Sequence, residues 1–432
     1  MLTSTDSISA AQALAYLATA RAEADHLPEA LQAEPLDIRR VAVIGAGTMG
    51  RGIAIALLEA GTAAILLDRD GDLVEQGRQG IARHYARRVS AGKISGTLAE
   101  QRQSQLLSTT DWSILADADL VIEAVYEDLT VKQDVFRRID ALAGPDAILA
   151  TNTSYLDIDD IAAVTRRPEN VLGLHFFSPA HVMRLLEVVR AARTSPATLA
   201  TGMALGAKLG KSAVLASNAF GFIGNRIYNA YRRECEFMLE DGAWPEDVDQ
   251  ALTAIGFAMG PFAVADLSGL DIAWRMRRAR AATRDPRERY VPILDRLCEL
   301  GRLGRKTGAG YYRYVDGKAL PAADDAVRGV IERASAERGI VRQTLAPEAI
   351  RRRALLAMAN EAGLLLAEGV ALRSGDVDVA LTEGYGFPRT LGGPVFWARH
   401  QPTDRLQAEL QALGEATGHG FVRADLSVFF DH

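Results

Sequence analysis

A histidine and a glutamate lie twelve residues apart in the stretch GLHFFSPAHVMRLLEVV (173–189), and together they could perform acid–base chemistry. Histidine is the side chain whose ordinary pKa lies near neutral, which suits a general base. A carboxylate beside an imidazole fixes its tautomer and stabilises the imidazolium. Glu187 is flanked by leucine and valine on both sides, where an acid is costly to bury unless it is paired. His175 and Glu187 are therefore candidates for a catalytic pair, although each could also be an ordinary strand residue.

A glycine-rich turn, IGAGTMGRG (44–52), has the Gly-x-Gly-x-x-Gly spacing of dinucleotide-binding sites. It follows an apolar run and opens a helical pattern, so its glycines would let the backbone approach a pyrophosphate at a helix N-terminus. Asp68 lies 18 residues beyond Gly50, where a carboxylate accepts from a ribose 2′-hydroxyl and repels a 2′-phosphate. This favours NAD over NADP, although Arg69 weakens the preference. The residues assigned to the cofactor by this pattern are Gly45, Gly47, Thr48, Met49, Gly50 and Asp68.

The elements that must position these residues alternate along the chain. Between residues 41 and 217, short β-branched runs alternate with helix-patterned segments. The runs that read as strands are 41–45, 63–68, 119–125, 147–154, 171–177 and 185–189. Their nearly continuous apolar character is typical of strands buried on both faces, as in a parallel sheet covered by helices. We therefore predict an α/β, doubly wound domain.

Beyond residue 218 the pattern is helical, and it contains an internal similarity. RECEFMLEDGAWPEDVDQALTAIGFAMGP (233–261) aligns with NEAGLLLAEGVALRSGDVDVALTEGYGFPRTLGGP (360–394), and the turn residues agree as well as the helices. This indicates a duplication. The predicted parts are a linker-like helix (1–38), an NAD-binding domain (39–218), a first helical C-terminal domain (219–318) and a second that duplicates it (319–432).

Composition narrows the class of protein. The 432-residue chain carries a net charge of −6, which argues against nucleic acid as a partner but permits an anionic small ligand. Its two cysteines fit no metal or redox spacing. The N-terminal stretch lacks the pattern of a signal peptide, and no run is apolar enough to span a membrane. We expect no membrane association and take the cytoplasm as the default compartment.

Several motifs, in order, carry a resemblance to a known family: GAGTMGRG, VIEAVYEDL, TNTS, HFFSPAHVMRLLEVV, GFIGNR, MGPF and GRKTGAGYY. The chain resembles the 3-hydroxyacyl-CoA dehydrogenases, and most closely the dehydrogenase part of the fused hydratase/dehydrogenase enzymes of the peroxisomal bifunctional type. The resemblance covers about residues 38–400 and implies a Rossmann-type domain followed by two tandem all-α domains. It also implies NAD-dependent oxidation of (S)-3-hydroxyacyl-CoA to 3-ketoacyl-CoA. Hydration of enoyl-CoA is not predicted, because no hydratase-like sequence precedes the match.

The resemblance assigns roles at the reacting end. His175 would take the proton of the 3-hydroxyl while C3 gives its hydride to NAD, and Glu187 would hold the imidazole. Ser154, in TNTS, and Asn225, in GFIGNR, would bind the reacting oxygen and position His175.

Further cofactor and substrate contacts are implied at other positions. Glu127, Lys132 and Lys306 occupy family positions that help to hold NAD, as do Ser154 and Ser178, the latter standing where some members have asparagine. For the CoA phosphates the sequence offers Arg87, Arg88 and Lys93, which could equally form a solvated helix face. No metal site is predicted.

The sequence also leaves two alternative functions open, and it predicts an oligomeric state. A dehydrogenase of a free hydroxy acid, of the gulonate type, would share the glycine turn and the His/Glu pair but usually has one helical domain. A non-catalytic NAD-binding protein would be free to lose His175, Glu187, Ser154 or Asn225, and all four are present. The duplicated block predicts a monomer, because it would cover an apolar surface that otherwise needs a partner.

Overall fold

The computed structural model describes residues 9–320 and 323–430. It forms two compact units. The sheet unit comprises Tyr16–Asn225 and Glu368–Tyr385, and the helical unit comprises Met1–Ala15, Arg226–Ala367 and Gly386–His432. The predicted linker-like helix begins among residues outside the described part. No helix within the described ranges is long and apolar enough to cross a membrane.

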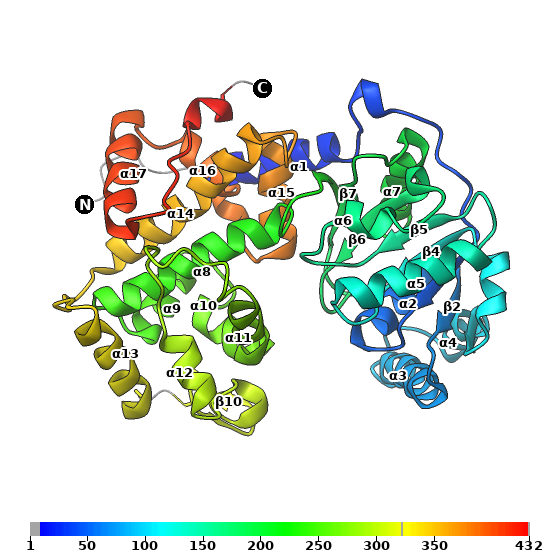
Figure 1. Cartoon of the computed structure of the whole chain (residues 1–432), viewed down its shortest axis with the longest axis horizontal. Coiled ribbons are helices and arrows are strands. Elements are labelled where there is room, and N and C mark those ends of the chain that lie inside the picture. The colour runs from blue at the N-terminus through cyan, green and yellow to red at the C-terminus, as the bar shows by residue number, and fades with distance from the viewer. Residues whose placement is uncertain (1–8, 321–322, 431–432) are drawn as a thin grey trace. The chain divides into compact units, whose positions relative to one another are not determined.

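One sheet organises the sheet unit (Figure 1). It has eight strands in the order β3-β2-β1-β4-β5-β6-β7-β8. Its strands are β1 (Arg40–Ile44), β2 (Ala63–Leu67), β3 (Leu106–Thr109), β4 (Leu120–Glu123), β5 (Ile148–Thr151), β6 (Val171–Phe176), β7 (Leu185–Arg190) and β8 (Ser212–Ser217). Strands β1 to β6 pair in parallel. This arrangement confirms the predicted doubly wound α/β fold, and the first six strands have the Rossmann order.

Two features of the sheet differ from the sequence prediction. Strand β7 pairs antiparallel with β6, and β8 runs parallel to β7, so the sheet is mixed. The short strand β3 and the strand β8 were not predicted.

The helices along the chain have the following bounds. In the sheet unit they are α2 (Thr48–Glu59), α3 (Gly71–Ser90), α4 (Gly96–Ser104), α5 (Leu129–Leu142), α6 (Ile158–Ala162), α7 (Pro196–Lys208) and α15 (Ser374–Gly384). In the helical unit they are α9 (Pro245–Thr253), α10 (Pro261–Ser268), α11 (Leu270–Ala279), α12 (Ile293–Glu299), α13 (Asp325–Glu337), α14 (Pro347–Ala367), α16 (Pro394–Arg399) and α17 (Thr403–Thr417). Helices α1 (Ala10–Ala24) and α8 (Gly224–Asp241) contain the boundaries between the units.

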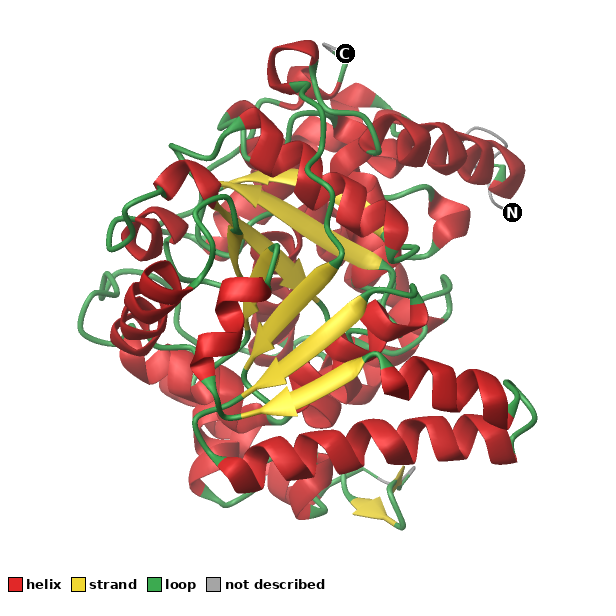
Figure 2. Cartoon of the chain, turned by 90° about the vertical axis from the view of Figure 1, so that its right-hand side faces the viewer, coloured by secondary structure: helices red, strands yellow, loops and turns green. Residues whose placement is uncertain are grey.

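The strands other than β3 are largely buried, which explains their continuous apolar character, and helices lie around the sheet (Figure 2). Alternate strand residues, among them Leu174, Phe176 and Leu186, join helices α2 and α7 in one large apolar cluster. His175 lies between two of these residues, and side chains alternate along a strand. It therefore points to the opposite face of the sheet, and Glu187 does the same.

The segment that ends in α15 belongs to the sheet unit although it comes from the second helical block. Helix α15 packs on β7 and β8. The backbone N–H of Ser217 donates to the carbonyl of Val370 at 2.9 Å, and the Ser217 hydroxyl donates to the carbonyl of Gly369 at 2.7 Å. The compact units thus divide the chain at other places than the predicted domain boundaries.

Helices α8 and α14, which align in the internal similarity, are joined by two reciprocal ion pairs in the helical unit. Arg226 Nε donates to Glu361 Oε1 at 2.5 Å, and Arg353 Nε donates to Glu234 Oε1 at 2.7 Å. Arg353 lies 127 positions after Arg226, and Glu361 lies 127 positions after Glu234. Each pair is thus the image of the other, which is the pattern of an isologous contact between two copies of a motif.

The DVD motif of each repeat caps a helix. Asp247 accepts from the N–H of Trp244 at the start of α9, and Asp376 accepts from the N–H of Arg373 at the start of α15. The second aspartate of the first copy, Asp249, accepts from the N–H groups of Phe262 and Ala263 at the start of α10. These bonds satisfy N–H groups that a helix N-terminus leaves without partners.

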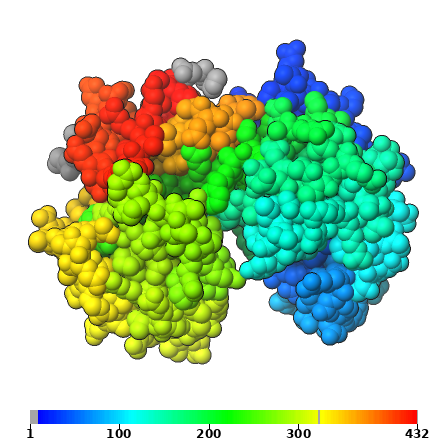
Figure 3. Space-filling view, in the orientation of Figure 1, coloured from blue at the N-terminus to red at the C-terminus, as the bar shows by residue number. Residues whose placement is uncertain are grey.

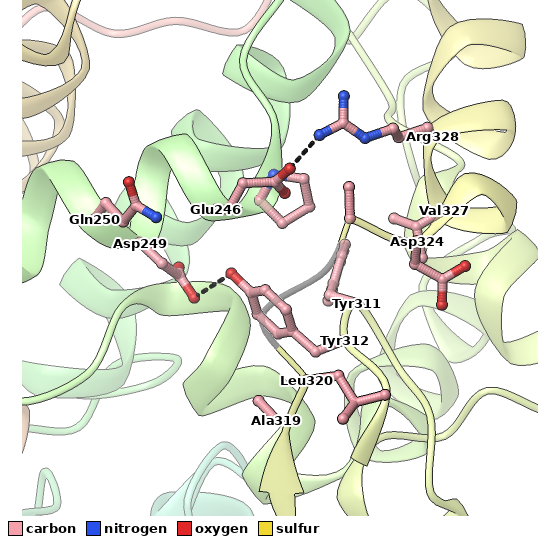
Figure 4. A pocket seen from close by; sticks show the side chains of 12 residues that line it. Glu246, Asp249, Gln250, Tyr311, Tyr312, Ala319, Leu320, Asp324, Val327 and Arg328 are labelled. Atoms are coloured by element: carbon pink, nitrogen blue, oxygen red, sulfur yellow. Dashed lines mark hydrogen bonds and ion pairs between the residues drawn. The ribbon is translucent and has the colours of Figure 1, made fainter. Parts of the chain in front are cut away.

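Two buried aspartates also anchor the GRKTGAGYY stretch. Asp249 accepts from the Tyr312 hydroxyl at 2.8 Å, beside a small pocket of the helical unit (Figure 4). Asp266 accepts from the N–H groups of Tyr311 and Tyr312 at 2.9 Å each. Burial raises the pKa of each aspartate to about 6. The tandem helical part is therefore not entirely helical, because this stretch leads into a small hairpin of β9 (Tyr314–Val315) and β10 (Lys318–Ala319).

Candidate active site

The antiparallel register of β6 and β7 places His175 directly opposite Glu187. The imidazole Nδ1 lies 2.6 Å from Glu187 Oε2, and the two side chains are 5% and 0% exposed. The other carboxylate oxygen, Oε1, accepts from the N–H groups of Ile223 (3.2 Å) and Gly224 (2.9 Å). Because the carboxylate is fixed on one side by backbone and on the other by Nδ1, the ring nitrogen that can accept a proton is Nε2.

Aromatic rings enclose the histidine. Phe177 lies 4.4 Å from the His175 ring and Phe222 lies 5.6 Å from it, measured between ring centroids. Phe222 has φ of 48°, a left-handed conformation that is strained for a bulky side chain. Its turn carries the chain into α8, where the next two amides donate to Glu187. The GFIGNR motif thus supplies both a wall of the site and the support of its carboxylate.

Asn225 lies in the first turn of α8. Its Oδ1 accepts from the Tyr385 hydroxyl at 2.8 Å. Tyr385 also meets Phe177 edge-on, with 5.4 Å between the ring centroids. These contacts connect Asn225, through two aromatic rings, to the ring of His175.

The TNTS loop that holds Ser154 follows β5, next to β6 in the sheet. Asn152 Oδ1 accepts from the N–H of Phe176 at 2.8 Å, which fixes the backbone beside His175. Glu127 Oε1 accepts from the Thr153 hydroxyl at 2.6 Å and from the N–H of Ser154 at 2.8 Å. The loops after β4 and β5 are therefore held together at the carboxyl edge of the sheet, where doubly wound folds bind ligands.

Lys132 is buried, and its ammonium forms ion pairs with two carboxylates. Its Nζ lies 2.7 Å from Glu123 Oε1 and 3.3 Å from Glu127 Oε2. Glu123 Oε2 also accepts from the Thr151 hydroxyl at 2.7 Å. The Lys132 side chain is only 1% exposed, whereas Glu127 is 37% exposed. Of these groups, Glu127 is the one that a ligand can reach.

The glycine turn has the shape that a dinucleotide requires. A Cβ on Gly45 would lie 2.6 Å from the carbonyl oxygen of Ala124, and a Cβ on Gly50 would lie 1.8 Å from the carbonyl oxygen of Gly45. A Cβ on Gly47, in contrast, would meet nothing within 4 Å. Space is thus left above the N-terminus of α2, which begins at Thr48. Asp68 Oδ2 accepts from the N–H of Ala46 at 2.8 Å, so the carboxylate lies beside the turn. These residues fit NAD, whose pyrophosphate needs a close backbone and a helix N-terminus.

Two other predicted cofactor residues are less closely tied to this turn. Ser178 is exposed in the loop after β6. Lys306 belongs to the helical unit, where its Nζ lies 2.5 Å from Asp271 Oδ1.

The predicted CoA contacts lie on and beside α3, which is drawn in blue at the lower right of Figure 3. Arg87 and Lys93 are exposed. Arg88 is half-buried and forms an ion pair with Glu59 of α2, so much of its charge is already compensated.

The sequence reasoning missed four residues that support the site: Glu123, Asn152, Phe177 and Tyr385. Glu123 had the same signal as Glu187, an acid in an apolar run. Asn152 lies two residues before Ser154, and Phe177 lies directly before Ser178, but neither has a pattern of its own. Tyr385 is 160 residues from its partner Asn225, and no local signal indicates such a contact.

Comparisons with known proteins agree with this geometry. The family description "3-hydroxyacyl-CoA dehydrogenase, NAD binding domain" matches residues 40–219, and "3-hydroxyacyl-CoA dehydrogenase, C-terminal domain" matches residues 221–314. The peroxisomal bifunctional enzyme of Danio rerio is 41% identical over 418 residues, which cover 93% of this chain and 58% of that protein. The chain spans about half the length of the curated relatives it matches.

Two solved structures cover nearly the whole chain. The 3-hydroxybutyryl-CoA dehydrogenase of Escherichia coli is 29% identical, with a TM-score of 0.78 over 91% of this chain and 98% of that one. The dehydrogenase part of multifunctional enzyme 1 from C. elegans is 27% identical, with a TM-score of 0.68 over 97% and 98%. The chain belongs to the 3-hydroxyacyl-CoA dehydrogenase family.

Proposed function

We propose that this protein oxidises the 3-hydroxyl of an (S)-3-hydroxyacyl-CoA to the ketone, with NAD as the hydride acceptor. The observation that carries the proposal is the buried His175–Glu187 pair, 2.6 Å apart, in a chain whose NAD-binding domain belongs to this family. Oxidation of an alcohol requires removal of one proton and one hydride, and the pair provides a base for the proton.

The roles of the protein groups follow from their chemistry. A bound NAD would supply the acceptor for the hydride that leaves C3. His175 accepts the hydroxyl proton at Nε2, while Glu187 at Nδ1 stabilises the imidazolium that forms. Ser154 and Asn225 donate hydrogen bonds to the reacting oxygen and so favour its developing negative charge.

The cofactor would rest on the glycine turn, from Gly45 to Gly50, with Asp68 at its ribose. Glu127, Ser154, Ser178 and Lys306 are proposed as further contacts. Lys132 is proposed to support these contacts indirectly, because its ammonium forms an ion pair with Glu127 at 3.3 Å.

The contacts to the acyl-CoA substrate and the oligomeric state are also proposals. Arg87 and Lys93 are candidates for the CoA phosphates because they are exposed on a basic helical lobe, and Arg88 ranks below them because it is paired with Glu59. The second helical block is proposed to be a duplicate of the first, on the reciprocal ion pairs of α8 and α14, and the protein to be a monomer. The predicted compartment remains the cytoplasm, while the relatives' names place those proteins in peroxisomes.

The test is a nicotinamide assay in the reverse direction. Purified protein is mixed with NADH and acetoacetyl-CoA, in parallel with NADPH and with the free 3-keto acid, and absorbance of the reduced nicotinamide is followed. We expect oxidation that requires both NADH and the CoA ester. The variant His175→Ala should lose roughly 10²- to 10⁴-fold in kcat, which is the usual contribution of a general base.

Each other result has a definite meaning. No turnover with this ester, or with longer and dicarboxylic acyl-CoAs, would refute the proposal. Turnover of the free acid alone would indicate a hydroxy-acid dehydrogenase. A nearly full rate in His175→Ala would refute the assignment of the base.

A further inference from the structure

Tyr385 touches two groups of the candidate active site from a distant part of the chain. It directly follows the last residue of α15, and its hydroxyl donates to Asn225 Oδ1 at 2.8 Å. Its ring meets Phe177, which in turn packs against the ring of His175 at 4.4 Å. All four residues belong to the sheet unit.

The approach of this tyrosine requires a glycine in the GFIGNR motif. A Cβ on Gly224 would lie 2.1 Å from Cε2 of Tyr385, and backbone at the start of α8 could not move away without disturbing the amides on Glu187. The glycine therefore makes room for the tyrosine as well as donating to the carboxylate.

The segment that delivers Tyr385 is firmly attached to the sheet. Ser217, at the end of β8, makes hydrogen bonds to the carbonyls of Val370 and Gly369. Glu383 forms an ion pair with Arg184 at 3.1 Å, and Asp378 accepts from the Tyr16 hydroxyl at 2.8 Å. A residue at the end of such a helix has a fixed position, which is what a positioning group needs.

We propose that Tyr385 is a positioning residue of the active site, and this proposal rests on the proposed dehydrogenase function. A carboxamide can rotate by half a turn and exchange its oxygen for its nitrogen. In the observed orientation the Tyr385 hydroxyl donates to Oδ1 and holds the amide of Asn225 in place, so that its N–H groups are left to donate to the reacting oxygen. The opposite orientation would present a carbonyl oxygen to a developing negative charge, which is repulsive.

The proposal gives the second helical block a part in the reaction. The block contributes the end of α15, and with it a group that acts through Asn225. A tyrosine that merely fills space would affect stability and leave the chemistry unchanged, so the two roles can be separated by kinetics.

The test compares Tyr385→Phe with Tyr16→Phe. Both changes remove only a phenolic oxygen. Tyr385→Phe loses the hydrogen bond to Asn225, whereas Tyr16→Phe loses a hydrogen bond to Asp378, which lies in α15. With acetoacetyl-CoA and NADH, we expect Tyr385→Phe to lower kcat by about 5- to 50-fold, less than loss of a direct oxyanion donor. The KM for NADH should not change. Tyr16→Phe should keep the wild-type kcat, and the melting temperature of both variants is recorded by circular dichroism.

A double-mutant cycle shows whether the effect passes through Asn225. In an Asn225→Ala background, Tyr385→Phe should cause no further loss of kcat, because the group that it positions is gone. Multiplicative losses in the double variant, or equal rates in Tyr385→Phe and Tyr16→Phe, would overturn this role while leaving the proposed function in place. A wild-type enzyme that reduces no acyl-CoA ester would refute both.

Discussion

At the scale of single residues, both oxygens of Glu187 are in use, and they require different things of the side chain. Oε2 faces His175 Nδ1, whereas Oε1 accepts from two backbone N–H groups. A glutamine can satisfy the backbone only by keeping its oxygen there. Its amide N–H would then point at Nδ1 and select the tautomer that is protonated on Nε2, which is unable to act as a base.

Glu187→Gln should therefore lose rate while keeping its structure. We expect kcat to fall by roughly 10²- to 10⁴-fold, as when a triad carboxylate is replaced by an amide. The KM for the acyl-CoA and the melting temperature should stay close to the wild-type values. Steady-state kinetics and thermal unfolding measure these quantities, and a large rise in KM with unchanged kcat would contradict the role.

The sequence pattern could indicate the buried acids of the site but not the polar groups around the reacting oxygen. Glu187 is visible because an acid in an apolar strand demands a partner, and Glu123 is visible by the same argument. Ser154 and Asn225 come from the family resemblance alone. Tyr385 has no signal, because its contact depends on how two segments 160 residues apart meet in space.

At the scale of elements, the glycine turn separates two effects that a sequence motif combines. A side chain at Gly50 would collide with the carbonyl oxygen of Gly45, whereas one at Gly47 would point into open space above α2. Gly50 is therefore needed by the fold, and Gly47 by the cofactor.

Gly47→Ala and Gly50→Ala should therefore behave differently. We expect Gly47→Ala to unfold at the wild-type temperature and to bind NADH at least tenfold more weakly, because the methyl group would occupy the place of the pyrophosphate. Gly50→Ala should lower the melting temperature clearly. Fluorescence titration with NADH and thermal unfolding distinguish these results, and equal NADH affinity in Gly47→Ala and the wild type would contradict the placement of the cofactor.

The direction of β7 was within reach of the sequence, since only eight residues separate β6 from β7. A parallel crossover needs a dozen or more, so this connection permits an antiparallel pair only. Buried strands have the same apolar pattern in either direction, which is why the pattern alone suggested a parallel sheet. The short β3, which is only partly buried, gave no such signal.

The loop between these strands is held by a buried lysine whose behaviour with pH can be predicted. Lys211 Nζ donates to the carbonyls of Ala180 and Met183 at 2.5 Å each. Burial lowers the pKa of Lys211 from 10.5 to about 8. Below about pH 8 the amine is charged in both the folded and the unfolded chain, so the cost of burying the charge is present in full. Between about 8 and 10.5 the unfolded chain binds more protons, so the stability contributed by this residue rises with pH.

Lys211→Met removes this dependence. The difference in melting temperature between wild type and Lys211→Met should shift in favour of the wild type between about pH 7 and about pH 9.5, because other titrating groups are common to both proteins. Thermal unfolding of the pair at several pH values measures the difference. A difference that stays constant or moves in favour of the variant would contradict the lowered pKa.

At the scale of the whole molecule, the internal similarity predicts two related helical blocks, and two ion pairs join α8 and α14, the helices that it aligns. Arg226–Glu361 and Arg353–Glu234 are reciprocal, as in a symmetric dimer, but both are made inside one chain. The sequence could not indicate that an inner segment of the second block, Glu368–Tyr385, belongs to the sheet unit. The assignment follows from the packing of its helix α15 on β7 and β8, which lie far from it in the sequence.

Reciprocal contacts made within one chain do not depend on protein concentration, and this leads to the prediction for assembly. Light scattering behind size exclusion should give a mass near 46.6 kDa at low micromolar concentration, unchanged on dilution. Glu361→Ala removes the ion pair between Glu361 and Arg226 and should lower the melting temperature, yet the mass should remain that of one chain because no subunit boundary is altered. A mass of twice this value would mean that α8 and α14 do not replace a partner subunit. A variant that changed mass together with stability would place the reciprocal ion pairs between two chains instead of within one.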